Sequence, residues 1–401
     1  MRITRIDTFP VSAGWKNWLF LKVHTDKGLH GVGEGTLNGF IRTTEAGVRE
    51  LEHLVIGEDP RRVHALSKHL MESVSLDGGH IHRTVVAAIE VACWDILGKS
   101  LGVPIHQLLG GRVRESVLGY ANGWYRTERT PEHFLAAARA TVARGFHALK
   151  LDPFGTAQGI IEDDELRLAR SILAAIRAEF PSLRILIDVH ARFTEADSLR
   201  AARALADLDL YWWEEPTTRE REQPANAVAA QCPIRVATGE MYDTVGQFFT
   251  LAAGGGVNIF QPEPMSLGGI ANTLAVANLA AAHGSWIAPH QSGGPVATAV
   301  CLQLAACVPN FLIQEHFLPF NEPWTNDLVT WTPTIDPVNG HLSLPDGPGL
   351  GVDLVEAVAR EHPYDPKAYL NVHQEGWEKR LGQKAAAASA GDTTTPAKRA
   401  R

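Results

Sequence analysis

Cysteine and methionine are scarce in this chain of 401 residues, which contains four of each. The cysteines form no CxxC pair and show no metal-binding spacing; they are Cys93, Cys232, Cys301 and Cys307. Isolated cysteines of this kind are typical of reduced, buried thiols in cytosolic proteins. We therefore expect a cytoplasmic protein without a cysteine-based metal site.

Long apolar segments are missing as well. The longest, LAVANLAAAHGSWIA, is interrupted by His283 and Gly284 and is too short to span a bilayer. The first residues, MRITRIDTFPVS, alternate like a strand and contain no apolar segment of the kind found in signal peptides. These features predict a protein that has no membrane partner.

An excess of positive charge is also absent. Lys and Arg number 37 against 45 Asp and Glu, so the formal net charge is −8. No basic block is large enough for nucleic-acid binding, and an acidic protein of this kind can still carry a locally positive site. The length favours two domains, or a barrel with a cap, over one small core.

The first 115 residues have the pattern of a small α+β unit. Two alternating runs joined by Asp26-Lys27-Gly28 predict a β-hairpin, and helical patterns follow at about 44–57, 60–74 and 81–100. Three glycines, Gly31, Gly33 and Gly35, resemble a phosphate loop. No helix begins directly after them, so we do not expect a nucleotide site there.

From residue 116 to about 320, short apolar runs alternate with amphipathic, Ala-rich segments. The runs are SVLGYANGW, HALKLDPF, RILIDVH, LYWWEEP, IRVATGE, VNIFQPE, SWIAPH and FLIQEH. Strands that each precede a helix predict a parallel sheet covered on both faces, and eight such units predict an α/β barrel of the TIM type.

The rest of the chain is irregular and then polar. Residues 321–382 are rich in Pro and Gly, and we interpret them as a return segment that completes the N-terminal unit. Residues 383–401 have low complexity and predict a disordered tail.

Almost every predicted strand ends in a polar residue. Spacings of 26 residues separate Asp188 from Glu214 and Glu214 from Glu240, which corresponds to one strand–helix unit each. Strand ends surround the active site of such barrels, so three carboxylates would meet there and repel one another. A hard divalent cation removes this repulsion, and all-oxygen ligands favour Mg²⁺.

Two histidines accompany these acids. His290 ends the seventh strand beside Glu263 on the sixth, and a carboxylate on one imidazole nitrogen makes the other a stronger base. His190 lies two residues after Asp188 on the third strand, so both side chains are expected to face the barrel mouth. Lys150 on the second strand supplies a fixed positive charge.

Taken together and in order, these motifs resemble the enolase superfamily. They are IDVHAR, WWEEP, ATGE, QPE with SLGGI, APHQSGGP and LIQEH, and the resemblance is to the mandelate racemase subgroup and its galactonate dehydratase-like members. It implies a (β/α)₇β barrel closed by an α+β capping domain made from both chain ends. It also implies a homo-oligomer and a small carboxylate as substrate.

The resemblance also implies roles for the site residues. Asp188, Glu214 and Glu240 would bind Mg²⁺, the Glu263–His290 pair would be the base and His190 the acid. Glu315 would hold the enolate oxygens or the substrate carboxylate. The implied reaction is dehydration of an aldonate or aldarate to a 2-keto-3-deoxy acid through an enolate, with Mg²⁺ and Lys150 stabilising the charge.

Further candidate substrate contacts lie at strand ends and in the cap. Asn122 and Asp152 end the first and second strands, and Trp15 and Trp18 belong to a segment that can close over a sugar acid. Asp152 occupies the place of a second lysine that mandelate racemase-like members use as a base, and Glu263 replaces the usual aspartate.

Several alternative functions stay open. A cycloisomerase or lactonising enzyme acting on an anhydro-sugar acid or a sugar lactone would use the same enolate. A racemase or epimerase would need bases on both faces of the substrate carbon, and the missing second lysine counts against it. A barrel hydrolase would need His-X-His on the first strand, where the chain has Tyr120-Ala121-Asn122. A metabolite-binding relative would lack turnover altogether.

Overall fold

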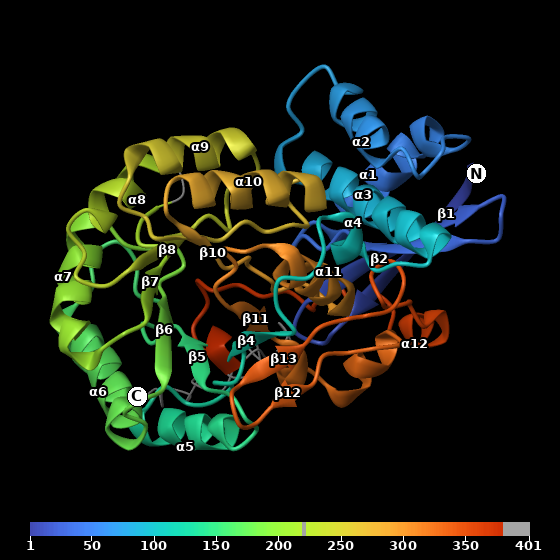
Figure 1. Ribbon diagram of the computed structural model, residues 1–401. Coiled ribbons are helices and arrows are strands. Elements are labelled where there is room, and N and C mark those ends of the chain that lie inside the picture. Colours follow the sequence, from blue (N-terminus) through green and yellow to red (C-terminus); the bar gives the residue numbers. More distant parts are fainter. Residues whose placement is uncertain (219–221, 380–401) are drawn as a thin grey trace, which may run out of the picture.

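The computed structural model describes residues 1–218 and 222–379 (Figure 1). The predicted disordered tail at 383–401 lies outside the described residues, as do the last three residues of the predicted return segment. Within the described part of the chain, no helix is both long and apolar enough to cross a membrane.

The N-terminal unit is an antiparallel three-stranded sheet packed on three helices. Its elements are β1 (Ile3–Ser12), β2 (Asn17–Thr25), β3 (His30–Glu34), α1 (Ile41–Val55), α2 (Val63–Glu72) and α3 (Gly79–Leu101). The turn between β2 and β3 has Gly28 at φ +75°, as the hairpin signal predicts. Helix α3 is buried along most of its length and ends at Gly102 in the left-handed conformation typical of a C-terminal cap.

Two of the three glycines that resemble a phosphate loop serve close packing in β3. A Cβ atom at Gly31 would lie 2.0 Å from the carbonyl oxygen of Ala92, and one at Gly33 would lie 2.0 Å from that of Ala88. Both carbonyls belong to α3, so glycine lets the strand approach the helix backbone. The sequence spacing therefore reflects packing within this unit.

The eight strands predicted between residues 116 and 320 are all present in the described chain. They are β4 (Ser116–Ala121), β5 (Ala148–Leu151), β6 (Arg184–Asp188), β7 (Trp212–Glu214), β8 (Val236–Thr238), β9 (Ile259–Phe260), β10 (Trp286–Ile287) and β11 (Gln314–His316). Neighbours along the chain pair in parallel, and β11 pairs with β4. The amide of Leu312 donates to the carbonyl of Ile287 at 2.8 Å, which joins β10 to the segment before β11 and closes the barrel.

A helix follows each of the first seven barrel strands, so the order is (β/α)₇β. The helices are α5 (Pro131–Val142), α6 (Asp163–Glu179), α7 (Glu195–Leu205), α8 (Glu222–Ala229), α9 (Val245–Gly254), α10 (Ile270–Ala282) and α11 (Pro295–Cys307). Figure 1 shows α5 to α10 as an arc outside the strands. Short elements α4 (Ile105–Leu108) and η1 (Ala206–Leu208) lie in connections. Caps such as the Thr244–Gln247 capping box fix where the helices begin.

The C-terminal segment runs along both parts of the molecule. Its elements are η2 (Leu318–Phe320), η3 (Pro323–Leu328), β12 (Ile335–Asp336), β13 (His341–Ser343), α12 (Glu356–Glu361) and η4 (Trp377–Lys379). Strand β13 pairs antiparallel with β4 and so extends the barrel sheet. The predicted return segment therefore joins the barrel as well as the N-terminal unit. The chain then joins β1, where the amide of Ser12 donates to His362 at 2.9 Å. Boundaries at 115/116 and 320/321 stay predictions.

Two buried carboxylates of the N-terminal unit cap helices of the barrel. Glu90 of α3 accepts hydrogen bonds from the amides of Ile270 at 3.0 Å and Ala271 at 3.1 Å, at the start of α10. Glu34 of β3 accepts from the amide of Ala297 at 2.9 Å, in the first turn of α11. Carboxylates are favourable at helix N-termini, so these contacts fix the unit over the β9 and β10 ends of the barrel.

Candidate active site

The inside of the barrel is organised in two levels. The lower level is a hydrophobic cluster with one residue from each strand or from the position directly beside it: Tyr120, Ala148, Leu186, Trp212, Ala237, Ile259, Ala288 and Ile313. Side chains alternate along a strand, so the residue two positions further faces the same side. On seven strands that residue is polar; the seven are Asn122, Lys150, Asp188, Glu214, Gln261, His290 and Glu315. We call these seven residues the mouth ring.

On the remaining strand, β8, the corresponding residue is Gly239. Its φ of +128° is a conformation that residues with a side chain rarely adopt. The next residue, Glu240, then brings its carboxylate to Asp188 and Glu214, and one oxygen from each of the three lies within 4.8 Å of the others. The predicted metal ligands are therefore brought together by three neighbouring strand ends.

The three carboxylates fit a hard divalent cation. Asp188 and Glu214 are buried, and Oε2 of Glu240 is buried without a hydrogen-bond donor in the described structure. Burial and neighbouring carboxylates raise the pKa of Glu214 although Lys150 opposes this rise. Burial also disfavours ionisation of Asp188, but the charges of His190 and Lys150 outweigh it and lower its pKa. Carboxylates this close favour a bound cation because it offsets their repulsion.

Lys150 is the only described cation that contacts several acids of the mouth ring. Its Nζ lies 2.7 Å from Glu214, 3.0 Å from Glu315 and 3.1 Å from Asp188. Burial alone would lower the pKa of Lys150, but these three carboxylates raise it well above its ordinary value. This direction favours a positive charge on Lys150 beside the three carboxylates.

His290 and Glu263 meet as the sequence predicts. Nδ1 of His290 lies 2.8 Å from Oε2 of Glu263, and Nε2 lies 3.4 Å from Oε2 of Glu240. The longer Glu263 side chain thus reaches the imidazole in place of the usual aspartate. Burial would lower the pKa of His290, but Glu240, Glu263 and Glu315 raise it to about 10. Because Glu263 engages Nδ1, Nε2 is the nitrogen that faces the carboxylates.

His190 reaches the site by a different path from the one expected. Strand β6 ends at Asp188, and His190 follows in a turn with φ +50°, so strand alternation does not orient it. Its amide donates to Oδ1 of Asp188 at 2.8 Å, and its Nδ1 lies 2.7 Å from Oδ2 of Asp152. Burial would lower the pKa of His190, but Asp188 and Asp152 raise it.

Asp152 is not placed as a substrate contact. It is completely buried; its Oδ2 accepts from His190 and Arg192, and its Oδ1 accepts from the amide of Phe154 at 2.9 Å. All of its acceptor oxygens are thus used within the protein. The predicted contact between Asp152 and the substrate is therefore wrong. Asp152 bonds to His190 and orients its imidazole.

Glu315 and Asn122 hold each other. The amide nitrogen of Asn122 donates to Oε1 of Glu315 at 2.7 Å, and the backbone amide of Gln291 donates to Oε2 at 2.8 Å. Both side chains belong to the mouth ring. A direct role in substrate binding stays a prediction for each.

The two cap tryptophans differ in position. Trp18 is completely buried in the largest hydrophobic cluster, where it packs edge-on against Phe20 with ring centroids 6.1 Å apart. The predicted contact between Trp18 and a substrate is wrong because Trp18 lies within β2, facing the core. Trp15 stacks on Phe317 just beyond β11, with ring centroids 5.9 Å apart, and donates to Asn321 at 2.9 Å. Trp15 therefore lies between the cap and the barrel mouth.

Three residues beside the site were not predicted from the sequence: Arg192, Trp377 and Glu215. Arg192 bonds to Asp152, and the ring of Trp377 lies edge-on to His190 with centroids 5.4 Å apart. Glu215 has φ +48° and accepts a hydrogen bond from Thr238 at 2.6 Å. Arg192 and Glu215 lie inside the motifs IDVHAR and WWEEP and could have been found there. Nothing near Trp377 in the sequence indicates its place.

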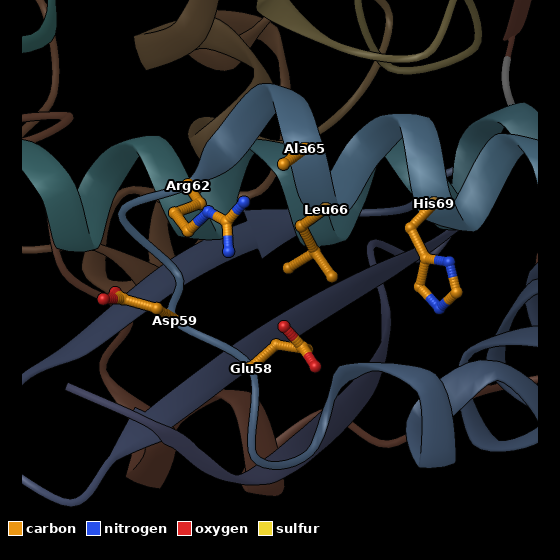
Figure 2. Close-up of a pocket in the computed structure, with 6 residues that line it drawn as sticks. All are labelled: Glu58, Asp59, Arg62, Ala65, Leu66 and His69. Atoms are coloured by element: carbon orange, nitrogen blue, oxygen red, sulfur yellow. The ribbon is translucent and has the colours of Figure 1, made fainter.

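A surface cavity of about 250 Å³ lies elsewhere, in the N-terminal unit (Figure 2). Its lining comes from α2 and the segment before it: Glu58, Asp59, Arg62, Ala65, Leu66 and His69. None of these residues belongs to the barrel. We therefore place the candidate active site at the mouth ring.

Comparison with known proteins agrees with this geometry. Residues 133–358 match the family "Enolase C-terminal domain-like", and residues 10–110 match the "Mandelate racemase / muconate lactonizing enzyme, N-terminal domain". The chain belongs to the enolase superfamily. The predicted fold, a TIM-like barrel with a capping domain, is confirmed, and so is the predicted resemblance.

The relatives of this superfamily member include named dehydratases. A D-galactonate dehydratase from Ralstonia nicotianae is 34% identical, covering 90% of this chain and 94% of the relative. A D-gluconate dehydratase from Thermoproteus tenax is 31% identical, covering 88% and 71%. A solved mandelate racemase/muconate lactonizing enzyme from Jannaschia sp. CCS1 is 31% identical with a TM-score of 0.83, covering 91% and 98%.

Proposed function

We propose that this protein is a Mg²⁺-dependent hydro-lyase that dehydrates an aldonate or aldarate to a 2-keto-3-deoxy acid. The observation that carries the proposal is the cluster of three carboxylates at the barrel mouth, Asp188, Glu214 and Glu240, which lies against two carboxylate-supported histidines. The named activities of the relatives, D-galactonate and D-gluconate dehydratase, support the substrate class.

The two histidines have the surroundings that an acid and a base require. His290 follows β10, and His190 follows β6, four strands away around the closed barrel. Nε2 of His290 takes the proton from the carbon next to the substrate carboxylate, since Glu263 holds Nδ1 and stabilises the imidazolium. His190, whose pKa is raised, donates a proton to the hydroxyl on the next carbon, which leaves as water. The resulting enol tautomerises to the keto acid.

Asp188, Glu214 and Glu240 would hold the Mg²⁺ ion. When bound there, it supplies positive charge for the enolate oxygens and offsets the carboxylates that raise the pKa of His290. Lys150 adds a fixed charge from β5. Glu315, which Asn122 and Gln291 hold, is proposed to help hold the enolate oxygens or the substrate carboxylate.

A screen of aldonates and aldarates for semicarbazide-reactive 2-keto acid tests the proposal. We expect turnover of one or a few acids, loss of turnover with EDTA and its return with Mg²⁺. His190→Asn should lower kcat by at least about 10²-fold, in the usual range for losing a general acid. Turnover without added metal, or full activity of the variant, would contradict the proposal.

Proton NMR of the same reactions separates the open alternatives. Dehydration gives a keto-deoxy product, a cycloisomerase conserves composition, and a racemase exchanges the substrate proton without loss of water.

The proposal includes a cytoplasmic location and a homo-oligomer, both of which stay predictions. The four free cysteines support a reducing location.

A further inference from the structure

One member of the mouth ring has no hydrogen-bond partner. Gln261 is completely buried, and both Oε1 and Nε2 of its side chain lack a partner in the described structure. The other six ring residues each make at least one side-chain hydrogen bond or ion pair. A buried, unpaired carboxamide is costly, so its presence needs an explanation.

The position of Gln261 directs its carboxamide toward the inside of the barrel mouth. Ile259, two residues earlier on β9, belongs to the interior cluster, and Phe260 between them packs in the outer core. Strand alternation then turns Gln261 inward. Glu263, the partner of His290, follows two residues later, and β10 with His290 is the neighbouring strand. The backbone amide of Gln261 is already used, since it donates to Thr238 at 2.9 Å.

The chemistry of the carboxamide selects its partner. Oε1 needs a donor and Nε2 needs an acceptor, and a hydroxyl group offers both. A carboxylate offers acceptors alone and would leave Oε1 unpaired. The negative charge of the substrate would instead lie near Lys150. This residue belongs to β5, which is four strands from β9 in either direction around the barrel. The substrate carboxylate and the Gln261 carboxamide would thus occupy opposite sides of the mouth.

We propose that Gln261 is a substrate-recognition residue that pairs with a hydroxyl group of the sugar acid near His290. The inference rests on the proposed function and deepens it. A site that is built to pair a hydroxyl rejects an acid that lacks it, because the buried carboxamide is then left unpaired. The unpaired group also lowers the stability of the free protein, as recognition residues often do.

Binding measurements test this assignment. We would titrate D-gluconate, D-galactonate and their monodeoxy analogues in the presence of Mg²⁺ into His190→Asn protein, in which turnover is slowed by at least about 10²-fold. With Gln261 present, loss of the recognised hydroxyl should weaken Kd roughly 10- to 100-fold. In the double variant His190→Asn/Gln261→Met, removal of the same hydroxyl should change Kd less than about threefold.

Thermal unfolding supplies a second measurement. Gln261→Met should keep or raise the Tm, because an apolar side chain of similar size replaces an unpaired one. Gln303→Met is the matched control: Gln303 is equally buried, but its Oε1 accepts from the amide of His106 at 2.8 Å. This control should lower the Tm and leave hydroxyl discrimination unchanged.

The outcomes separate the two proposals. Two results would overturn the assignment, because they would show that Gln261 pairs with an internal water. One is equal hydroxyl discrimination with and without Gln261. The other is a loss of Tm in Gln261→Met as large as the loss in Gln303→Met. If the protein with Gln261 bound none of the aldonates and aldarates of the screen, the proposed function would be contradicted and this inference with it.

Discussion

At the scale of single residues, the imidazole of His190 is held by a carboxylate that lies far from it in the sequence. Asp152 comes from the end of β5, and Arg192 also bonds to that carboxylate. The left-handed backbone of His190 is uncommon for a residue with a side chain and is retained where surrounding contacts fix it. Strain of this kind concentrates at functional sites, which agrees with the proposed acid.

The Asp152→Asn variant tests this arrangement. We expect kcat to fall roughly 10²-fold with KM little changed, because the amide no longer fixes the imidazole through a charged hydrogen bond. Asp152 also raises the pKa of His190, so the alkaline limb of the kcat profile should move to lower pH. Asp164→Asn, on the exposed face of α6, is the control. A higher KM with unchanged kcat would instead restore Asp152 as a substrate contact.

At the scale of elements, helix α10 begins at a contact that crosses from the cap to the barrel. Glu90→Ala removes the acceptor of the Ile270 and Ala271 amides, which are buried or half-buried. We expect the free energy of unfolding to fall by about 2 kcal/mol, the cost of losing a helix cap and leaving buried donors unpaired. Denaturant unfolding measures this change.

A second glutamate of the cap is the control for that variant. Glu72 pairs with Lys68 on the exposed surface of α2, where a salt bridge contributes little. Glu72→Ala should change the free energy of unfolding by less than about 0.5 kcal/mol. Equal effects of the two substitutions would show that the Glu90 contact does not anchor α10.

At the scale of the whole molecule, the C-terminal segment is joined to the cap by ion pairs. Oδ2 of Asp353 lies 2.6 Å from His30 of β3, and Oδ1 lies 3.7 Å from Lys22 of β2. Burial would raise the pKa of Asp353, but the hydrogen bond from His30 and the charges of Lys99 and Lys22 lower it to about 2. The carboxylate therefore stabilises the fold when it is ionised.

This depressed pKa predicts how stability depends on pH. The contribution of Asp353 is complete above its unfolded pKa, near 4, and is lost as the pH falls toward 2. The Asp353→Asn variant should be less stable than the wild type by about 1 kcal/mol at pH 5, after allowance for partial exposure. The difference should shrink as the pH is lowered toward 2 in thermal unfolding experiments. A difference that stays constant with pH would contradict this.

The sequence by itself determined the eight strands, the order of elements and the three spaced acids, because strand periodicity and one strand–helix repeat are local properties. Only the tertiary structure decided that Trp18 faces the core, that Asp152 orients His190, that β13 extends the barrel sheet, and that Gln261 is left unpaired. Each of these depends on contacts between residues far apart in the chain, for which local patterns carry no signal.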